Sequence, residues 1–169
     1  MSSNVIGRAD GPTSIILSSE SGLSWINFFG FAIVILLLLP NVIYAVKFRG
    51  MVNRCKNKVM NLLEQIGRYA SMFFMSFNIG IAEFGFASPE AFIIYYVGNI
   101  ILLIAYCAIW VLYFKKIVLW KRMALVVIPT AIFLLSGITL RHYLLVISAI
   151  VFGIGHSYVT YQNVNGNLA

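Results

Sequence analysis

Residues 25–46 read WINFFGFAIVILLLLPNVIYAV, an apolar run without a single charged side chain. A helix needs about 20 apolar residues to cross the hydrocarbon core of a bilayer, so this run is long enough to span a membrane. The whole chain has the same character, because 61% of its 169 residues are apolar and 10% are charged. A soluble domain carries about 45–50% apolar and about 25% charged residues. We therefore expect an integral membrane protein.

Further apolar runs of helical length follow the first, and together they predict an all-α, multi-pass bundle of five transmembrane helices. The expected spans are residues 25–46, 69–87, 92–113, 123–140 and 143–161, within a bundle over 24–163. A polar tail over 1–23 precedes the bundle, and a short tail over 164–169 follows it.

Positive charge gathers in two short connections between the expected spans, and the net charge is +7. The basic residues of the two connections are Lys47, Arg49, Arg54, Lys56 and Lys58, and then Lys115, Lys116, Lys121 and Arg122. Because Lys and Arg concentrate in cytoplasmic connections, we expect the N-terminus outside and the C-terminus in the cytoplasm. The basic residues would then face anionic lipid headgroups. No aromatic and basic recognition motif accompanies the charge, which argues against nucleic-acid binding.

Residues 56–68, before the second span, have an amphipathic pattern. The apolar side chains that recur at helical spacing are Val59, Leu62, Leu63 and Ile66. Polar residues take the other face, where Glu64 and Arg68 are spaced for an i,i+4 ion pair. The pattern predicts an interfacial helix on the cytoplasmic leaflet. Alternatively, the segment extends the second span into the cytoplasm, since Gly67 permits a bend without requiring one.

Polar side chains inside the spans are costly in hydrocarbon, so each marks an internal pair or a functional site. The tight turn at residues 88–90 makes the second and third spans an antiparallel hairpin, in which Asn78 and Asn99 share a depth. These two residues form either an interhelical tie or a polar substrate contact. Glu83 is the only acid in an expected span. Its carboxylate either reaches the nearby outer water or Tyr95, or binds a proton or a cation.

The fifth span carries His156 in the inner third of the bilayer. Its imidazole is a hydrogen-bonded packing residue, a proton relay or a ligand to a cation. No second His, Cys or carboxylate is expected at its depth, so packing is favoured and no metal site is expected. Ala149, Gly153 and Ser157 form a ridge of small residues that permits close helix approach. The ridge suits packing near Pro129 of the fourth span, or contact with another subunit in a homo- or hetero-oligomer.

Residues 5–15 read VIGRADGPTSI. This segment resembles the G-x-A-D-G-P-T-x-I segment of the membrane β-subunits of sodium-pumping decarboxylases. The resemblance implies a helix break in the membrane and a role for Asp10 in moving sodium ions and protons. A carboxylate beside a helix break offers oxygens to a hard cation. The alternative is a turn at residues 11–12, with Asp10 as the N-cap of a helix.

Two further segments suggest the cellular setting. Residues 64–69, EQIGRY, and residues 155–158, GHSY, are similar to segments of small multi-pass membrane proteins of Firmicute-type bacteria. This resemblance implies a bacterial cytoplasmic membrane and no particular mechanism. Cys55 and Cys107 are expected at different depths and should form no disulfide.

The sequence offers no nucleophile elbow, Walker loop or dinucleotide fingerprint, so no catalytic residue and no cofactor is expected. The favoured function is non-enzymatic: a small cation or solute carrier, or a membrane subunit of a larger complex. The alternative is a membrane-embedded enzyme that acts on a lipid or isoprenoid at the cytoplasmic face. In that case Arg122, Tyr158 and His156 would meet the headgroup.

Overall fold

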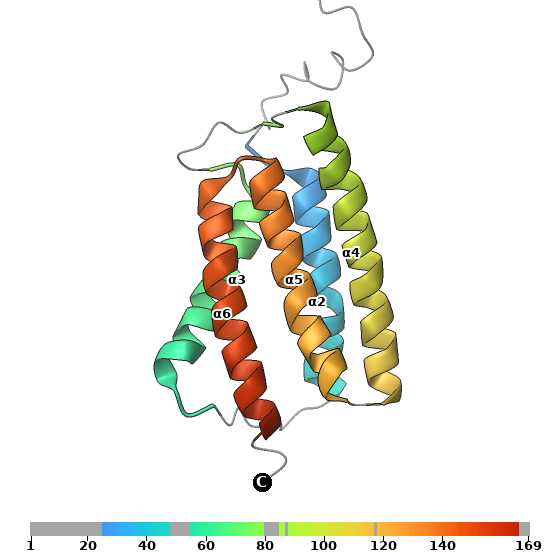
Figure 1. Cartoon of the computed structure of the whole chain (residues 1–169), viewed down its shortest axis with the longest axis vertical. Helices are drawn as coiled ribbons and strands as arrows, with labels where there is room; N and C mark the ends of the chain where they lie inside the picture. The colour runs from blue at the N-terminus through green and yellow to red at the C-terminus, as the bar shows by residue number, and fades with distance from the viewer. Residues whose placement is uncertain (1–24, 48–54, 80–84, 87, 117, 166–169) are drawn as a thin grey trace, which may run out of the picture.

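The computed structural model describes residues 25–47, 55–79, 85–86, 88–116 and 118–165. Within these residues the regular elements are the helices α2 (Phe28–Lys47), α3 (Lys58–Ser76), α4 (Pro89–Lys115), α5 (Leu119–Thr139) and α6 (Tyr143–Asn165). The helices lie side by side in one bundle (Figure 1). The strand-like pairing in the described part of the chain is a single isolated bridge between Ile26 and Phe77. The expected all-α architecture is therefore confirmed.

Four of these helices, α2, α4, α5 and α6, are long and apolar enough to cross a membrane. Large apolar side chains cover their outer surface; Ile93, Ile101 and Ile104 of α4 are all more than half exposed. Polar residues such as Asn99 and Ser136 are completely buried instead. An apolar exterior around paired polar groups is the arrangement that lipid favours. The architecture is that of a membrane protein.

Helix α3 differs from the predicted segments at both of its ends. It runs without interruption through Gly67, so the amphipathic segment and the start of the second expected span form one helix. The side chain of Asn57 caps its start by accepting from two backbone N–H groups of the first turn. The helix ends at Ser76 because Phe77 is extended and pairs with the segment before α2. The helix predicted over 69–87 is therefore shorter than expected, and α3 is not among the four candidate spans.

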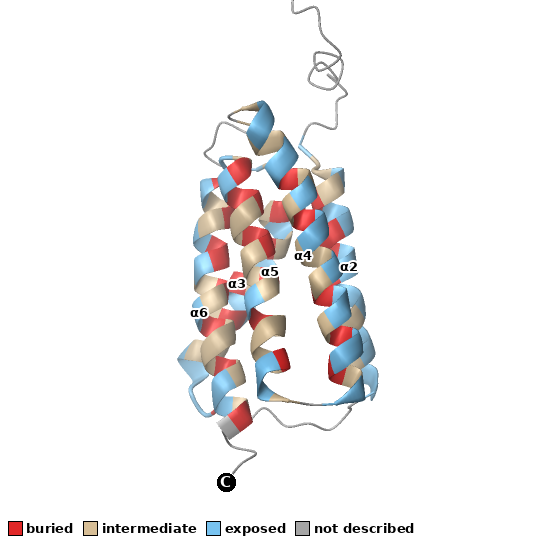
Figure 2. Ribbon diagram, turned by 45° about the vertical axis from the view of Figure 1, so that its right-hand side comes forward, coloured by how far each residue is buried: buried red, intermediate tan, exposed pale blue. Residues whose placement is uncertain are grey.

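The packing of the helices places the described basic residues of the two connections at one end of the bundle. Helix α3 packs along α6, α6 along α5 and α5 along α4, while α2 contacts α3 and α4. Buried residues line the inner faces of these helices (Figure 2). The C-terminal ends of α2, α4 and α6 lie at the same end of the bundle as the first residues of α5 (Figure 1). We call this end the basic end; its described cations are Lys47, Lys56, Lys58, Lys115, Lys116, Lys121 and Arg122.

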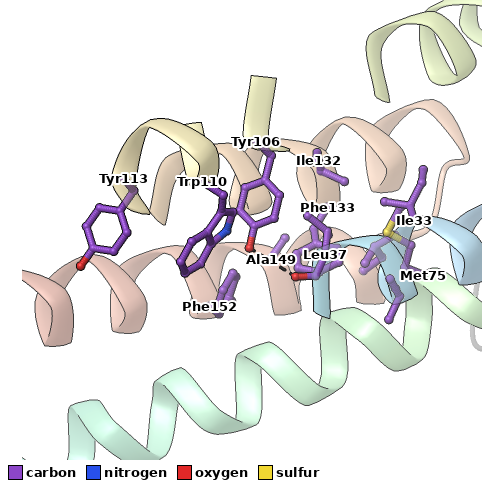
Figure 3. Close-up of a cluster of buried hydrophobic side chains, with 12 residues drawn as sticks. Ile33, Leu37, Met75, Tyr106, Trp110, Tyr113, Ile132, Phe133, Ala149 and Phe152 are labelled. Atoms are coloured by element: carbon purple, nitrogen blue, oxygen red, sulfur yellow. Dashed lines mark hydrogen bonds between the residues drawn. The ribbon is translucent and has the colours of Figure 1, made fainter. Parts of the chain in front are cut away.

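Aromatic side chains dominate the core near the basic end. Tyr106, Trp110 and Tyr113 follow one face of α4, and each is at most 6% exposed; Figure 3 shows them in a row. The rest of the core cluster is Ile33, Val34, Leu37, Met75, Ile132, Phe133, Leu145, Ala149 and Phe152. These residues come from all five helices, so burial of the α4 aromatics depends on the assembled bundle.

Small residues of α6 pack against other parts of the same chain. Ala149 is completely buried. A Cβ atom on Gly153 would lie 2.7 Å from the methyl carbon of Thr130, next to Pro129 of α5. The predicted packing joint between Gly153 and the region of Pro129 is therefore confirmed.

The turn between α5 and α6 is tied to the end of α3. Arg141 has a positive φ of 54°, a backbone conformation that residues other than glycine rarely adopt. The next residue, His142, is buried, and its Nδ1 accepts a hydrogen bond from the backbone N–H of Leu145 at 3.3 Å. Its Nε2 donates to the carbonyl oxygen of Phe77 at 3.4 Å. One imidazole thus caps α6 and holds the residue that follows α3.

Candidate functional site

A carboxylate from α3 meets an imidazole from α6 where the two helices cross. Oε1 of Glu64 lies 2.8 Å from Nδ1 of His156, and the guanidinium of Arg68 donates to the same oxygen. The Glu64 side chain is 10% exposed and that of His156 is 21% exposed. We call these three residues the Glu64 site. It joins a carboxylate, an imidazole and a guanidinium within hydrogen-bonding distance.

Two glycines allow α3 and α6 to approach closely enough for this contact. A Cβ atom on Gly67 would lie 2.4 Å from the backbone nitrogen of Phe152. A Cβ atom on Gly155 would lie 2.7 Å from the backbone nitrogen of Glu64. Real side chains do not tolerate such distances to backbone atoms, so only glycine fits at both positions. Because Gly155 directly precedes His156, the crossing places the imidazole beside the carboxylate.

Two contacts set the orientation of the His156 ring: the hydrogen bond with Glu64 and stacking on Phe152. Phe152, one helical turn earlier on α6, stacks on the imidazole with centroids 4.9 Å apart and an interplanar angle of 15°. The Arg68 guanidinium lies 6.0 Å from the centroid of the Phe152 ring. An ionised carboxylate only accepts hydrogen bonds, so Nδ1 of His156 must carry the hydrogen that points at Glu64. In the neutral ring, Nε2 is then the nitrogen that can take up a proton.

Charge at the Glu64 site favours the ionised carboxylate. Burial raises the pKa of Glu64, but the hydrogen bond from His156 and the positive charge of Arg68 outweigh it, so the pKa lies below its ordinary value. The Arg68–Glu64 pair is neutral as a unit. A proton or another cation at the site therefore adds a net positive charge to a partly buried position.

The structure places a carboxylate beside His156, where the sequence led us to expect none. Glu64 is in direct contact with the ring, and this contact fits a hydrogen-bonded packing residue as well as a proton relay. Sequence reasoning also missed Glu64 and Arg68 as site residues, although it paired them correctly with each other. The signal that could have identified them is the polar face of α3. That face points at α6, whereas Val59, Leu62 and Ile66 are more than half exposed.

The predicted pairing of Asn78 with Asn99 assumed a helix that continues to residue 87. Because α3 ends earlier, Asn78 lies beyond the helix, and its backbone N–H donates to the carbonyl oxygen of Trp25. Asn99 is completely buried in α4 and exchanges hydrogen bonds with Ser136 of α5 at 3.0 and 3.2 Å. Asn99 is therefore an interhelical tie to α5.

Only some of the other predicted site residues lie in the part of the chain that the structure describes. Glu83 and Asp10 lie outside the described residues. Within the described ranges, no group of three or more His, Cys, Asp or Glu side chains is placed to hold a metal ion. Arg122 and His156, expected together in an enzyme, have partners on different helices: Tyr113 of α4 for Arg122 and Glu64 of α3 for His156.

Comparisons of the chain with protein-family models, with curated proteins and with solved structures find no match. The chemistry of the Glu64 site is therefore argued from its own geometry.

Proposed function

We propose that this protein is a membrane carrier that exchanges a small monovalent cation for a proton at the Glu64 site. The observation that carries the proposal is the 2.8 Å contact between the Glu64 carboxylate and the His156 imidazole. His156 belongs to α6, one of the four candidate spans, and ionisable residues in membrane spans commonly belong to proton relays and ion pathways. Histidine is suited to the role because one ring nitrogen can accept a proton while the other donates a hydrogen bond.

Exchange follows from competition for one carboxylate. Glu64 can neutralise only one positive charge, and Arg68 already contributes one. A proton on Nε2 of His156 and a metal cation beside Glu64 then repel each other at close range. Binding of the cation favours release of the proton, and binding of the proton favours release of the cation. The partly exposed imidazole supplies the path to water.

Sodium is the cation to test first, because the segment around Asp10 resembles one in sodium-pumping membrane subunits. The proposed setting is a bacterial cytoplasmic membrane with the basic end in the cytoplasm, as the positive-inside rule predicts. In this orientation, the N-terminal tail is outside.

The test uses the purified full-length protein in proteoliposomes that enclose a pH-sensitive dye. With the membrane potential clamped at zero, sodium is added outside, and potassium and lithium are added in parallel experiments. We expect sodium entry to drive proton exit, so the interior becomes alkaline. Glu64→Gln and His156→Gln should abolish the response, although both variants still unfold cooperatively.

Glu90→Gln is the matched control, because Glu90 is a described carboxylate in the first turn of α4, exposed to solvent. It should respond like the wild type. A wild type without any cation-driven pH change would overturn the proposal, and so would a folded Glu64→Gln variant with normal exchange. Glu83→Gln belongs in the same series, since a loss of exchange there would move the ion-binding carboxylate to Glu83.

A further inference from the structure

The basic end carries far more positive than negative charge. Of the carboxylates in the described residues, Glu64 is already paired with Arg68 and His156, and Glu90 lies in the first turn of α4, at the other end of that helix from Lys115. Neither of these described carboxylates is therefore paired with Arg122 at the basic end. In a membrane, the nearest anions at this level are lipid phosphate groups.

Not every cation at the basic end is available for such an anion. Nζ of Lys121 donates to the carbonyl oxygens of Leu112 at 2.6 Å and Lys116 at 3.0 Å. Lys121 thus caps the C-terminus of α4, where free carbonyl groups carry partial negative charge. Arg122, the next residue, has a different environment.

Arg122 is held against an aromatic cluster formed by α2 and α4. Its Nε donates to the hydroxyl of Tyr113 at 3.0 Å, and its guanidinium carbon lies 6.0 Å from the centroid of that ring. Tyr44 of α2 packs against Tyr113 and Trp110, with centroids 5.9 and 5.5 Å away. The bond through Nε orients the guanidinium and does not use its two terminal amino groups. Those groups form the fork that matches a phosphate.

Lys47 adds a second positive charge beside the same cluster. It ends α2, one turn after Tyr44, and its Nζ lies 5.2 Å from the centroid of the Phe114 ring. Phe114 follows Tyr113 on α4 and packs against Trp110, with centroids 5.3 Å apart. Two cations from α2 and α5 therefore flank neighbouring aromatic residues of α4.

We propose that Arg122 binds the phosphate of an anionic phospholipid, with Lys47 as a second attractive charge. The terminal amino groups of Arg122 take the phosphodiester oxygens, and Tyr113 holds the guanidinium in place. The glycerol and acyl chains lie along the exposed apolar side chains of the neighbouring helices, such as Val46 and Val111. This site is separate from the Glu64 site and does not depend on ion exchange.

Native mass spectrometry of the full-length protein tests the proposal with equimolar dioleoyl phosphatidylglycerol and dioleoyl phosphatidylcholine. We expect the anionic lipid to be retained with a preference of about tenfold. Arg122→Gln should abolish the preference, and Tyr113→Phe should weaken it because the guanidinium loses its anchor. Lys115→Gln is the control, since Lys115 is exposed at the same end of α4 and should leave the preference unchanged.

Three results would overturn the proposal. The first is equal retention of both lipids by the wild type, and the second is an identical loss in Arg122→Gln and Lys115→Gln. The third is displacement of phosphatidylglycerol by millimolar inorganic phosphate, which would assign the site to a free phosphate. Thermal unfolding of each variant identifies misfolding, and Arg122→Lys, which keeps the charge but loses the fork, should retain only part of the preference.

Discussion

Glu64 of α3 and His156 of α6 are 92 positions apart in sequence and 2.8 Å apart between Oε1 and Nδ1. The contact exists because Gly67 and Gly155 have no side chains, so the backbone of each helix can lie directly against the backbone of the other. The same carboxylate also accepts from Arg68 on its own helix. Oε1 of Glu64 thus takes part both in an i,i+4 pair within α3 and in a contact between α3 and α6.

The first prediction concerns the strength of this link. Glu64→Gln should lower the free energy of unfolding by about 1–3 kcal/mol, because a charged hydrogen-bond acceptor is lost from a buried position. Combined with His156→Gln in a double-mutant cycle, the coupling should be about 1–3 kcal/mol. Unfolding by denaturant in mixed micelles measures both values. A coupling near zero would show that the contact does not hold α3 to α6.

The second prediction concerns the helix crossing. Gly67→Ala and Gly155→Ala should each destabilise the fold by about 1–3 kcal/mol or more, because the new methyl group meets backbone atoms that cannot move aside. Gly85→Ala is the control, since a Cβ atom there has no neighbour within 4 Å. Thermal unfolding in detergent compares the three variants. A Tm of Gly155→Ala equal to that of Gly85→Ala would contradict the crossing.

The third prediction is a pH dependence from His142. Burial lowers the pKa of His142 below its ordinary value, against the opposing effect of its hydrogen bond to the Phe77 carbonyl. A depressed pKa means that the unfolded chain binds the proton more tightly than the folded chain does. The contribution of neutral His142 to the free energy of unfolding is therefore fully present above about pH 6.5, and it is lost as the pH falls through the folded pKa. Protonation also prevents Nδ1 from accepting the Leu145 N–H.

Thermal unfolding between pH 7.5 and 5 should therefore show a falling Tm for the wild type. In His142→Asn this fall should be smaller, because a side-chain amide still caps the helix but does not titrate. Since Glu64 titrates below its ordinary range, its protonation occurs at lower pH than this window. Parallel curves for the wild type and His142→Asn would rule out His142 as the source.

The fourth prediction concerns the positive φ of Arg141. Left-handed backbone costs a residue with a side chain about 1 kcal/mol more than glycine. Arg141→Gly should therefore be more stable than Arg141→Ala by about this amount. Both variants remove the guanidinium, so the comparison of their Tm values isolates the backbone term. Equal values would show that the turn relaxes without strain.

Local sequence was sufficient for the helices themselves. The predicted apolar runs overlap most of α2, α4, α5 and α6, because transfer of a helix into lipid depends on its own side chains. Starts and ends were less predictable. The end of α3 at Ser76 depends on pairing of Phe77 with Ile26, which belongs to a distant part of the chain.

The Glu64 site depended on the tertiary structure. The sequence by itself determined an all-α, strongly apolar chain with a lone histidine in its last apolar run and an i,i+4 pair between Glu64 and Arg68. Only the packing of α3 on α6 decided that His156 completes that pair. The physical reason is that helix formation and lipid transfer are summed over neighbouring residues, whereas a contact across 92 positions depends on which helix faces fit. That fit rests on two glycines whose missing side chains leave no hydropathy signal.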